Sequence, residues 1–334
     1  MFIVESYALA VIMCVVTMLC WGSWANTQKL ASREWPFQLF YWDYAAGVVI
    51  LSLIGALTLG STGTVGRSFA ADLAQANGSS FFSAFTGGVV FNLANILLVA
   101  AIDIAGMSVA FPVAIGLALV IGVVTNYIAT PLGNPVMLFA GVGFVTIAIL
   151  LSATAYGKLS TTTARTPVLG IVISIIGGIL MGFFYRFVAA SMSPDFAKPV
   201  HGMLSPYTAV VLFSIGLFCS NFVFNSIMMI RPLSGRPVKF GDYFSMGNTR
   251  LHLIGILGGI IWCIGMLFSI IASGQAGFAI SYGLGQGATM VAAFWGVFIW
   301  KEFHNAPAGT NRILNSMFAA FIIGLALIIA ARVM

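Results

Sequence analysis

A few polar and aromatic side chains stand within long apolar stretches of this sequence, and their chemistry suits solute binding or proton transfer. The acidic one is Asp43, in the run YWDY at 41–44. A carboxyl group in a low-dielectric setting favours its neutral form, so Asp43 is predicted to carry a coupling proton. The competing interpretation is a carboxylate at a helix N-terminus, where the helix dipole stabilises negative charge.

Uncharged amides form the second group of candidates. Asn92 and Asn95 are three residues apart, and Asn221 and Asn225 are four apart, so each pair lies on one side of a helix. Amides at this depth suit a neutral solute rich in nitrogen and oxygen, and Asn92, Asn95 and Asn221 are predicted to bind it. Bonding between helices is the alternative, worth about 0.6 kcal/mol on average in membranes.

Gln286 stands one turn after Tyr282, and both are predicted to contact the solute. Gly283, Gly285 and Gly287 surround the glutamine. Glycines weaken a helix locally and let a solute or a second helix approach closely. The same glycines also suit simple helix packing, so this pattern has two interpretations.

The run CWGSWANTQ at 20–28 places two indole rings and an amide toward the end of the first apolar stretch. Trp21 and Trp24 are predicted to stack on a planar or ring-shaped solute, and Asn26 to bond its polar edge. The alternative is an aromatic belt at the membrane interface.

Arg186, in FFYRF at 183–187, is the one basic residue placed well within an apolar stretch. A guanidinium group can bind an anionic or carbonyl-rich solute through two parallel hydrogen bonds, so Arg186 is predicted to bind the substrate. The alternative is a side chain that extends to the membrane surface, because Arg186 comes late in its stretch.

The composition requires a membrane protein. Of 334 residues, 60% are hydrophobic and 7% are charged, whereas a soluble domain has about 25% charged residues. The net charge of +6 is therefore a topology signal rather than a nucleic-acid signal. The four cysteines form no CxxC pair, so neither a metal site nor a disulfide framework is indicated.

Sequence motifs for energy-coupled or hydrolytic chemistry are missing. The chain has no GxxxxGK[ST], HExxH or nucleophile elbow, so neither a nucleotide-driven pump nor an intramembrane hydrolase is supported. We expect no enzyme activity and no cofactor, with a proton gradient as the energy source.

Ten stretches are long enough to span a bilayer, since a spanning helix needs about 20 apolar residues. The predicted fold is an all-α polytopic membrane protein. Its spans are expected near 7–29, 39–60, 83–103, 107–130, 136–156, 168–191, 205–230, 251–273, 277–300 and 313–332. The turns at 104–106 and 274–276 are so short that their flanking helices must form hairpins.

The basic residues are distributed unevenly over the two sides of this topology. Side A, which carries the N-terminus, has three: Arg67, Lys198 and Arg332. Side B has ten: Lys29, Arg33, Lys158, Arg165, Arg231, Arg236, Lys239, Arg250, Lys301 and Arg312. The positive-inside rule then makes side B cytoplasmic and puts both termini outside.

The two halves of the chain are predicted to share one plan. Residues 87–116 aligned with 258–287, at an offset of 171, are identical at six of thirty positions. Five helices in each half is an odd number, so the halves would have opposite orientations, an arrangement common in secondary transporters. We expect a first repeat at 1–157, a short cytoplasmic linker at 158–167 and an inverted repeat at 168–334.

Several motifs resemble one known group of proteins. They extend from residue 20 to 303 and comprise CWGSW (20–24), YWDY (41–44), GGVVFNLAN (87–95), SPYTAVVLFSIG (205–216), RPLSGRP (231–237), GQAGFAISYGLGQ (274–286) and FWGVFIWKEF (294–303). The pattern resembles the drug/metabolite transporter superfamily, and more narrowly the ureide permeases and their bacterial relatives. The bacterial glucose/ribose/rhamnose uptake transporters are a looser likeness.

The resemblance implies proton-coupled import of allantoin, uracil or similar heterocycles, and adds weight to Asp43, Trp21 and Gln286. The plant proteins carry a long central cytosolic loop with a Walker-like sequence, which the short 158–167 linker lacks. That departure favours a bacterial inner-membrane protein and leaves the solute open.

The predicted function is therefore proton-coupled import of a small neutral polar solute. Its expected partners are that solute, protons and the lipid bilayer, with no nucleic acid and an unspecified oligomeric state. A sugar symporter, an exporter of metabolites or drugs, and a membrane receptor or enzyme without transport remain the alternatives.

Overall fold

Ten long apolar spans form the part of the protein that the structure describes, as the sequence predicts. The structure is a computed structural model that describes residues 1–31, 34–159 and 168–334. Within these ranges the only β-structure is an isolated bridge between Met192 and Leu204. The candidate spans are Tyr7–Ala31, Phe37–Leu57, Gly78–Ala105, Met107–Ala129, Pro135–Leu159, Val168–Ser191, Pro206–Ile230, Thr249–Ala276, Phe278–Ile299 and Thr310–Ala330. The protein is thus a multi-pass membrane protein.

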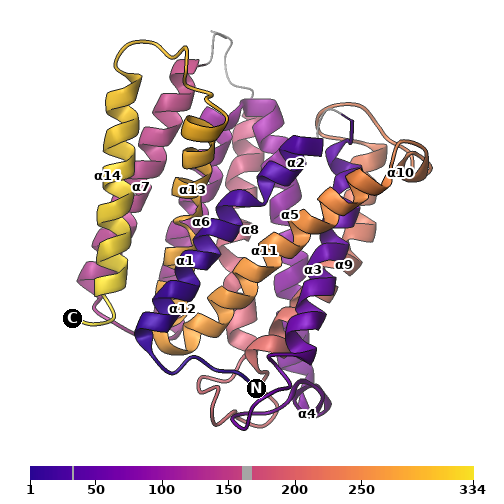
Figure 1. Cartoon of the computed structure of the whole chain (residues 1–334), viewed down its shortest axis with the longest axis vertical. Coiled ribbons are helices and arrows are strands. Elements are labelled where there is room, and N and C mark those ends of the chain that lie inside the picture. Colours follow the sequence, from indigo (N-terminus) through magenta and orange to yellow (C-terminus); the bar gives the residue numbers. More distant parts are fainter. Residues whose placement is uncertain (32–33, 160–167) are drawn as a thin grey trace.

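Eight spans are single helices. They are α3 (Phe37–Leu57), α5 (Gly78–Ala105), α6 (Met107–Ala129), α7 (Pro135–Leu159), α8 (Val168–Ser191), α9 (Pro206–Ile230), α11 (Thr249–Ala276) and α14 (Thr310–Ala330). Two short helices, α4 (Phe69–Gln75) and α10 (Asp242–Ser245), lie in the connections. The pair α7 and α14 stands at one edge of the bundle, joined where Gly141 meets Gly324 (Figure 1).

The first and ninth spans are interrupted. The first consists of α1 (Tyr7–Ser23) and α2 (Ala25–Ala31), which meet at Trp24. The ninth consists of α12 (Phe278–Gly285), α13 (Ala288–Phe294) and the π-helix η1 (Trp295–Ile299). Interrupted spans mark the solute sites of many transporters, because the break frees backbone groups at membrane depth.

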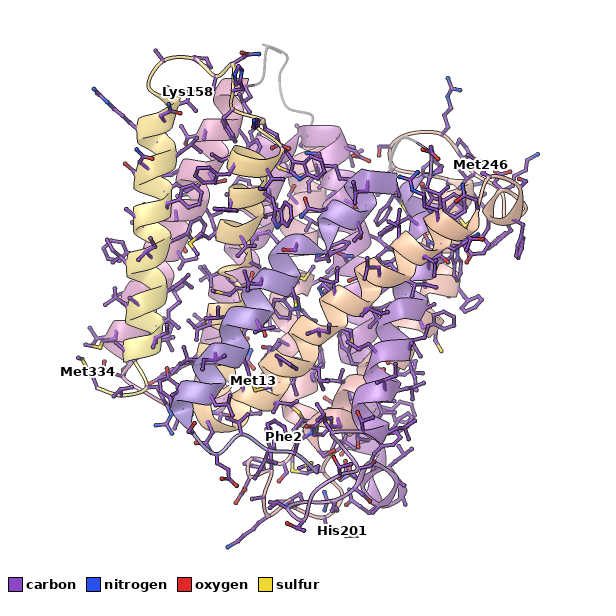
Figure 2. The ribbon with its side chains drawn as sticks, in the orientation of Figure 1. Phe2, Met13, Lys158, His201, Met246 and Met334 are labelled. Atoms are coloured by element: carbon purple, nitrogen blue, oxygen red, sulfur yellow. The ribbon has the colours of Figure 1, made fainter. Side chains whose placement is uncertain are left out.

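The crossings alternate between two ends of the bundle. Phe2, His201 and Met334 lie at one end, which corresponds to side A, and Lys158 and Met246 lie at the other, side B (Figure 2). Of the counted basic residues, Arg33 and Arg165 lie outside the described residues, as does most of the 158–167 linker. Which end faces the cytoplasm stays a prediction.

Glycines close both predicted hairpins. Gly106, between α5 and α6, has φ +77° and ψ 158°. Gly277, between α11 and α12, has φ +84° and ψ 152°. Positive φ at such a tight turn favours glycine. The two residues are 171 apart, and α5 and α11 are both 28 residues long, with starts separated by the same offset.

Two central helix crossings have matching backbone contacts. At the α5–α9 crossing, a β-carbon added at Gly88 would lie 1.9 Å from the Phe213 carbonyl oxygen. At the α3–α11 crossing, a β-carbon added at Gly259 would lie 2.0 Å from the Tyr44 carbonyl oxygen. Only glycine permits backbones to approach so closely.

The reciprocal contacts match as well. A β-carbon added at Gly216 of α9 would lie 2.1 Å from the Phe85 carbonyl oxygen, and one at Gly47 of α3 would lie 2.2 Å from that of Ile256. Each crossing therefore pairs one helix from the first half of the chain with one helix from the second half. These contacts agree with a shared plan, while the inverted relation of the halves and the boundaries of the repeats stay predictions.

Candidate functional site

An aromatic stack lies where α1, α11 and α12 meet. The Trp21 ring fits between two glycines, since β-carbons added at Gly265 and Gly285 would lie 2.6 and 2.7 Å from it. Its centroid is 5.9 Å from that of Trp262, with the planes 14° apart. The Trp21 indole N–H donates to the Trp262 carbonyl oxygen at 3.2 Å. Trp21 is thereby fixed beside the break in the ninth span.

Trp262 continues the stack into the other half of the chain. It stacks on Phe213 of α9 with a 5.7 Å centroid separation and a 15° interplanar angle. Phe91 of α5 lies 4.4 Å from it. Phe91 and Trp262 occupy equivalent positions at the 171-residue offset, so two aromatic rings from equivalent helices touch at the centre of the protein. These four rings, Trp21, Trp262, Phe213 and Phe91, are called the aromatic stack below.

Gln286 occupies the break in the ninth span. The Gly287 N–H bonds the Leu284 carbonyl and the Thr289 N–H bonds the Gln286 carbonyl, each three residues back, so the α-helical pattern is lost there. The side chain is 8% exposed, and its amide has no hydrogen bond to any described residue. A buried amide without a protein partner is available for a solute.

Tyr282 is engaged within the protein. It is fully buried, and its hydroxyl lies 3.1 Å from the Ala118 carbonyl oxygen and 3.2 Å from that of Met181. Its one proton is shared between these two acceptors. The ring packs against Gly122, where a β-carbon would lie 2.1 Å from it. This geometry favours a role in packing α12 against α6 and α8 over direct solute contact.

The amides of α5 face two different helices. Asn92 donates from Nδ2 to Ser220 Oγ of α9 at 2.9 Å, and Asn95 donates from Nδ2 to the Tyr41 hydroxyl of α3 at 3.1 Å. Both amides are buried. The Asn92 Oδ1 atom has no partner among the described residues.

The amides of α9 are also buried. Asn225 donates from Nδ2 to the Gln38 carbonyl oxygen at 2.8 Å, but its Oδ1 has no partner. Asn221 is 0% exposed, and neither its Oδ1 nor its Nδ2 is bonded to any described residue. The Tyr44 hydroxyl of α3, equally buried, is unpaired as well. Asn92, Asn95, Asn221 and Asn225 form what we call the amide cluster.

A cavity of about 240 Å³ opens beside the amide cluster at end B. Gln38, which accepts from Asn225, lines it, and so does Val99, one turn beyond Asn95. Its other lining residues are Pro36, Phe37, Ala100, Asp103, Met228, Ser234, Gly235, Arg236 and Val238. None of the four asparagines lines this cavity.

Trp24 and Asn26 lie nearer to end B than Trp21. The Trp24 ring packs 4.9 Å from Tyr44. Asn26 donates to the Ser23 carbonyl and accepts from the Trp300 indole N–H at 2.6 Å. Asn26 thus joins the ends of the two interrupted spans, which favours a structural role for it.

The same two spans are joined by an ion pair. Lys29 Nζ lies 2.6 Å from Glu302 Oε1, and the Tyr156 hydroxyl donates to Glu302 Oε2 at 3.0 Å. Trp295 of η1 donates to Ser23 Oγ at 2.9 Å. In this structure the first, fifth and ninth spans are therefore tied together at end B.

Asp43 forms a cluster that sequence analysis did not reveal. It is 3% exposed, yet both carboxylate oxygens are bonded. The Tyr243 hydroxyl of α10 donates to Oδ1, and His252 Nδ1 of α11 lies 2.9 Å from Oδ2. Trp35 packs against both partner rings. Asp43, Tyr243 and His252 are called the carboxylate cluster below; they come from three elements, so no local spacing indicated them.

Arg186 lies apart from the other candidates. It lines a cavity of about 200 Å³ at end A, together with Thr130, Ser273 and Gly277. It is partly buried and forms no hydrogen bond or ion pair with any described residue. The structure thus puts Trp21 against Gly285, next to Gln286, and Asn92 against Ser220, next to Asn221, while Asp43 and Arg186 stand toward opposite ends.

Comparison with known proteins shows to which family the chain belongs. The sequence profile of the Ureide permease family matches residues 40–163 and 158–331. The chain belongs to the Ureide permease family. Its members are transporters rather than enzymes. Ureide permeases 4 and 2 of Arabidopsis thaliana are each 23% identical to it, and the alignments cover 99% of this chain and 99% of each relative.

A third relative and a solved structure are also similar to this ureide permease family member. Ureide permease 5 of Arabidopsis thaliana is 22% identical over 99% of the chain and 96% of its own length. Its alignment runs over 398 positions, more than the 334 residues of this chain, so that relative carries inserted residues. A crystal structure of a protein at 16% identity covers 98% of this chain with a TM-score of 0.56, which shows a likeness of fold.

Proposed function

We propose that this protein is a secondary transporter of a ureide-like solute: small, neutral, planar and rich in N–H and C=O groups. Asn221 carries the proposal, because both ends of its fully buried amide lack a protein partner. A buried polar group left unpaired costs about 1–3 kcal/mol. A solute that offers both an N–H and a carbonyl would pair both ends.

The neighbouring groups extend the same chemistry. Oδ1 of Asn92 and Oδ1 of Asn225 are unpaired acceptors, and the Tyr44 hydroxyl is an unpaired donor or acceptor. Gln286 adds an amide at the break in the ninth span. Ureides and nucleobases present N–H and C=O groups along a flat edge that such amides can bond, and the partly exposed Trp21 ring lies beside the break in the ninth span. The named relatives are ureide permeases, which supports this class over a sugar.

Proton coupling at Asp43 is the second part of the proposal. Asp43 is a buried carboxylate in a membrane span, and its hydrogen-bond partners connect it to end B. Intramembrane acids commonly carry protons in transporters. The excess of Lys and Arg supports end B as the cytoplasmic end, so that import runs from end A to end B with the proton.

Uptake by proteoliposomes tests the proposal. We expect radiolabelled allantoin or uracil to accumulate under an imposed inward proton gradient, and unlabelled glucose not to compete. The Asn221→Leu variant should lose uptake, whereas Asn126→Leu should retain it. Asn126 is a buried amide of α6 whose Nδ2 bonds the Gly122 carbonyl of its own helix, so that only its Oδ1 is unpaired, whereas both ends of Asn221 are unpaired.

Three results would contradict the proposal. Competition by glucose would favour a sugar symporter, and accumulation only in vesicles of inverted orientation would favour an exporter. Uptake that ignores the proton gradient would remove Asp43 from its coupling role while leaving the solute site intact.

A further inference from the structure

Two members of the carboxylate cluster, Tyr243 and His252, are partly exposed, and the third, Asp43, is buried. The Asp43 side chain is 4% exposed, whereas that of His252 is 26% exposed. His252 uses Nδ1 to contact Asp43, and its Nε2 has no partner among the residues described. A β-carbon added at Gly247 would lie 2.5 Å from Nε2, so any other residue at 247 would cover this nitrogen. The imidazole therefore connects the buried carboxylate with water at end B.

Tyr243 holds the second carboxylate oxygen in a different way. Burial, its hydrogen bond to Asp43 and the charge of that carboxylate raise the pKa of the Tyr243 phenol. The phenol therefore keeps its proton near neutral pH and acts as a fixed donor. Trp35 packs 5.8 Å from the Tyr243 ring and 5.1 Å from the His252 ring, so it encloses the cluster from the side of α3.

The charged groups on the surrounding elements are engaged elsewhere. Glu34, which precedes α3, lies 3.9 Å from Arg250 on the first turn of α11, and both side chains are more than half exposed. Asp242 of α10 accepts from the Lys239 backbone N–H. None of these groups bonds the His252 ring. Asp43 is therefore its ionisable hydrogen-bond partner within the described chain.

We propose that His252 is the group through which Asp43 exchanges its proton with water at end B. The inference rests on the proposed coupling role of Asp43. In the release step, the neutral Asp43 acid passes its proton from Oδ2 to Nδ1 of a neutral ring while Nε2 of that ring gives its proton to water at end B. The acid becomes a carboxylate and the ring stays neutral with its proton on Nδ1. The reverse sequence takes a proton up from that water.

The His252→Gln variant, measured in proteoliposomes, distinguishes proton transfer by His252 from a purely structural role of this residue. Glutamine still donates a hydrogen bond to Asp43 but carries no exchangeable charge. We expect wild-type equilibrium exchange of radiolabelled allantoin, and an about tenfold slower accumulation under a proton gradient, a loss of about 1.4 kcal/mol in the driven step. His304→Gln is the matched control, since His304 is also at end B and bonds only Asn305. Accumulation by His252→Gln equal to this control overturns the inference.

A second measurement needs no solute. Trp35 lies edge-on to His252, so its fluorescence in the purified protein, isolated by subtracting Trp35→Phe, reports on the surroundings of the imidazole. We expect the Trp35 emission of Asp43→Asn to differ from that of the wild type, because the imidazole loses its carboxylate partner in the variant. Identical Trp35 emission in both proteins refutes the pairing. Absent allantoin exchange in the wild type counts against the proposed function alone, and the emission comparison still decides this inference.

Discussion

The α5–α9 and α3–α11 crossings share one backbone geometry and differ in their chemistry. Each brings a glycine against a carbonyl of the other helix: Gly88 against Phe213 and Gly259 against Tyr44. The α5–α9 crossing carries uncharged amides with unpaired atoms. The α3–α11 crossing carries the ionisable Asp43, with both oxygens paired.

Residues at equivalent positions of α3 and α9 show where the chemistry of the two crossings differs. At the offset of 169 that relates α3 to α9, Asn221 corresponds to Ser52, and Asp43 corresponds to Leu212. The Ser52 hydroxyl is paired with Ser214 at 2.7 Å, whereas Asn221 is unpaired. The difference teaches that two crossings with the same glycine contacts carry different side chains, unpaired amides at one and an ionisable carboxyl group at the other, to which the proposed function gives solute binding and proton binding.

The largest effect is expected from adding a methyl group at either crossing. Gly88→Ala and Gly259→Ala each place a β-carbon against backbone, which cannot move aside as a side chain would. Both variants should lose about 1–3 kcal/mol of stability, by similar amounts, in thermal denaturation of the purified protein.

The control for this pair is Gly143→Ala. Gly143 lies in α7 with nothing within 4 Å of an added β-carbon. Alanine favours a helix over glycine by about 1 kcal/mol, so this variant should be at least as stable as the wild type. A large loss at only one of Gly88 and Gly259 would break the equivalence of the crossings.

The second prediction separates function from stability at equivalent positions. Asn221→Leu should raise the melting temperature, because it removes an unpaired buried amide worth about 1–3 kcal/mol, and should weaken solute binding by about tenfold or more. Ser52→Ala should do the opposite: it loses a paired hydroxyl and some stability, and keeps solute affinity.

Melting curves with and without allantoin measure both quantities, since a ligand stabilises the state it binds. Loss of stability in Asn221→Leu would mean that the amide is paired in the native protein. Loss of affinity in Ser52→Ala would place the solute at both crossings.

Most of the fold could be predicted because it depends on local patterns. Runs of about 20 apolar residues predicted the ten spans, and short turns at 104–106 and 274–276 predicted the hairpins, which the structure closes at Gly106 and Gly277. The glycines that flank Gln286 indicated a weakened helix at that position. No sequence feature indicated the break at Trp24 or the π-helix at Trp295, because hydrophobicity alone does not report on backbone geometry.

The site was only partly predictable, since membrane depth identifies unusual residues but not their partners. Asn221 and Gln286 were selected by residue type and depth, and both ends of the Asn221 amide are buried and unpaired among the described residues. His252 was missed because it is 209 residues from Asp43, and only the packing of α11 on α3 joins them. Tyr282 was selected for its polarity, but its hydroxyl contacts carbonyls of α6 and α8.

A third, moderate effect is expected where the crossings touch. Trp262 and Phe91 are equivalent in sequence, but only Trp262 also stacks on Trp21. Trp262→Leu should weaken solute binding by roughly 3- to 10-fold, in line with the 0.5–1.5 kcal/mol of an aromatic pair, because it removes one face of the stack. Phe91→Leu should lower the melting temperature with little change in affinity. Equal losses of affinity in both variants would show that the whole aromatic stack faces the solute.

The smallest effect should reveal which crossing responds to pH. The raised pKa of Tyr243 means that the folded state holds this proton more tightly than the unfolded state does. Its contribution to stability is therefore fully present below about pH 10, the usual value for tyrosine, and is lost as the pH rises further. The difference in melting temperature between wild type and Tyr243→Phe should be constant from neutral pH to about pH 10 and then shrink. The gain in Asn221→Leu should not change over this range, because the amide does not titrate. A pH-dependent gain at Asn221 would show that the α5–α9 crossing senses protons too, and would end the division of roles between the crossings.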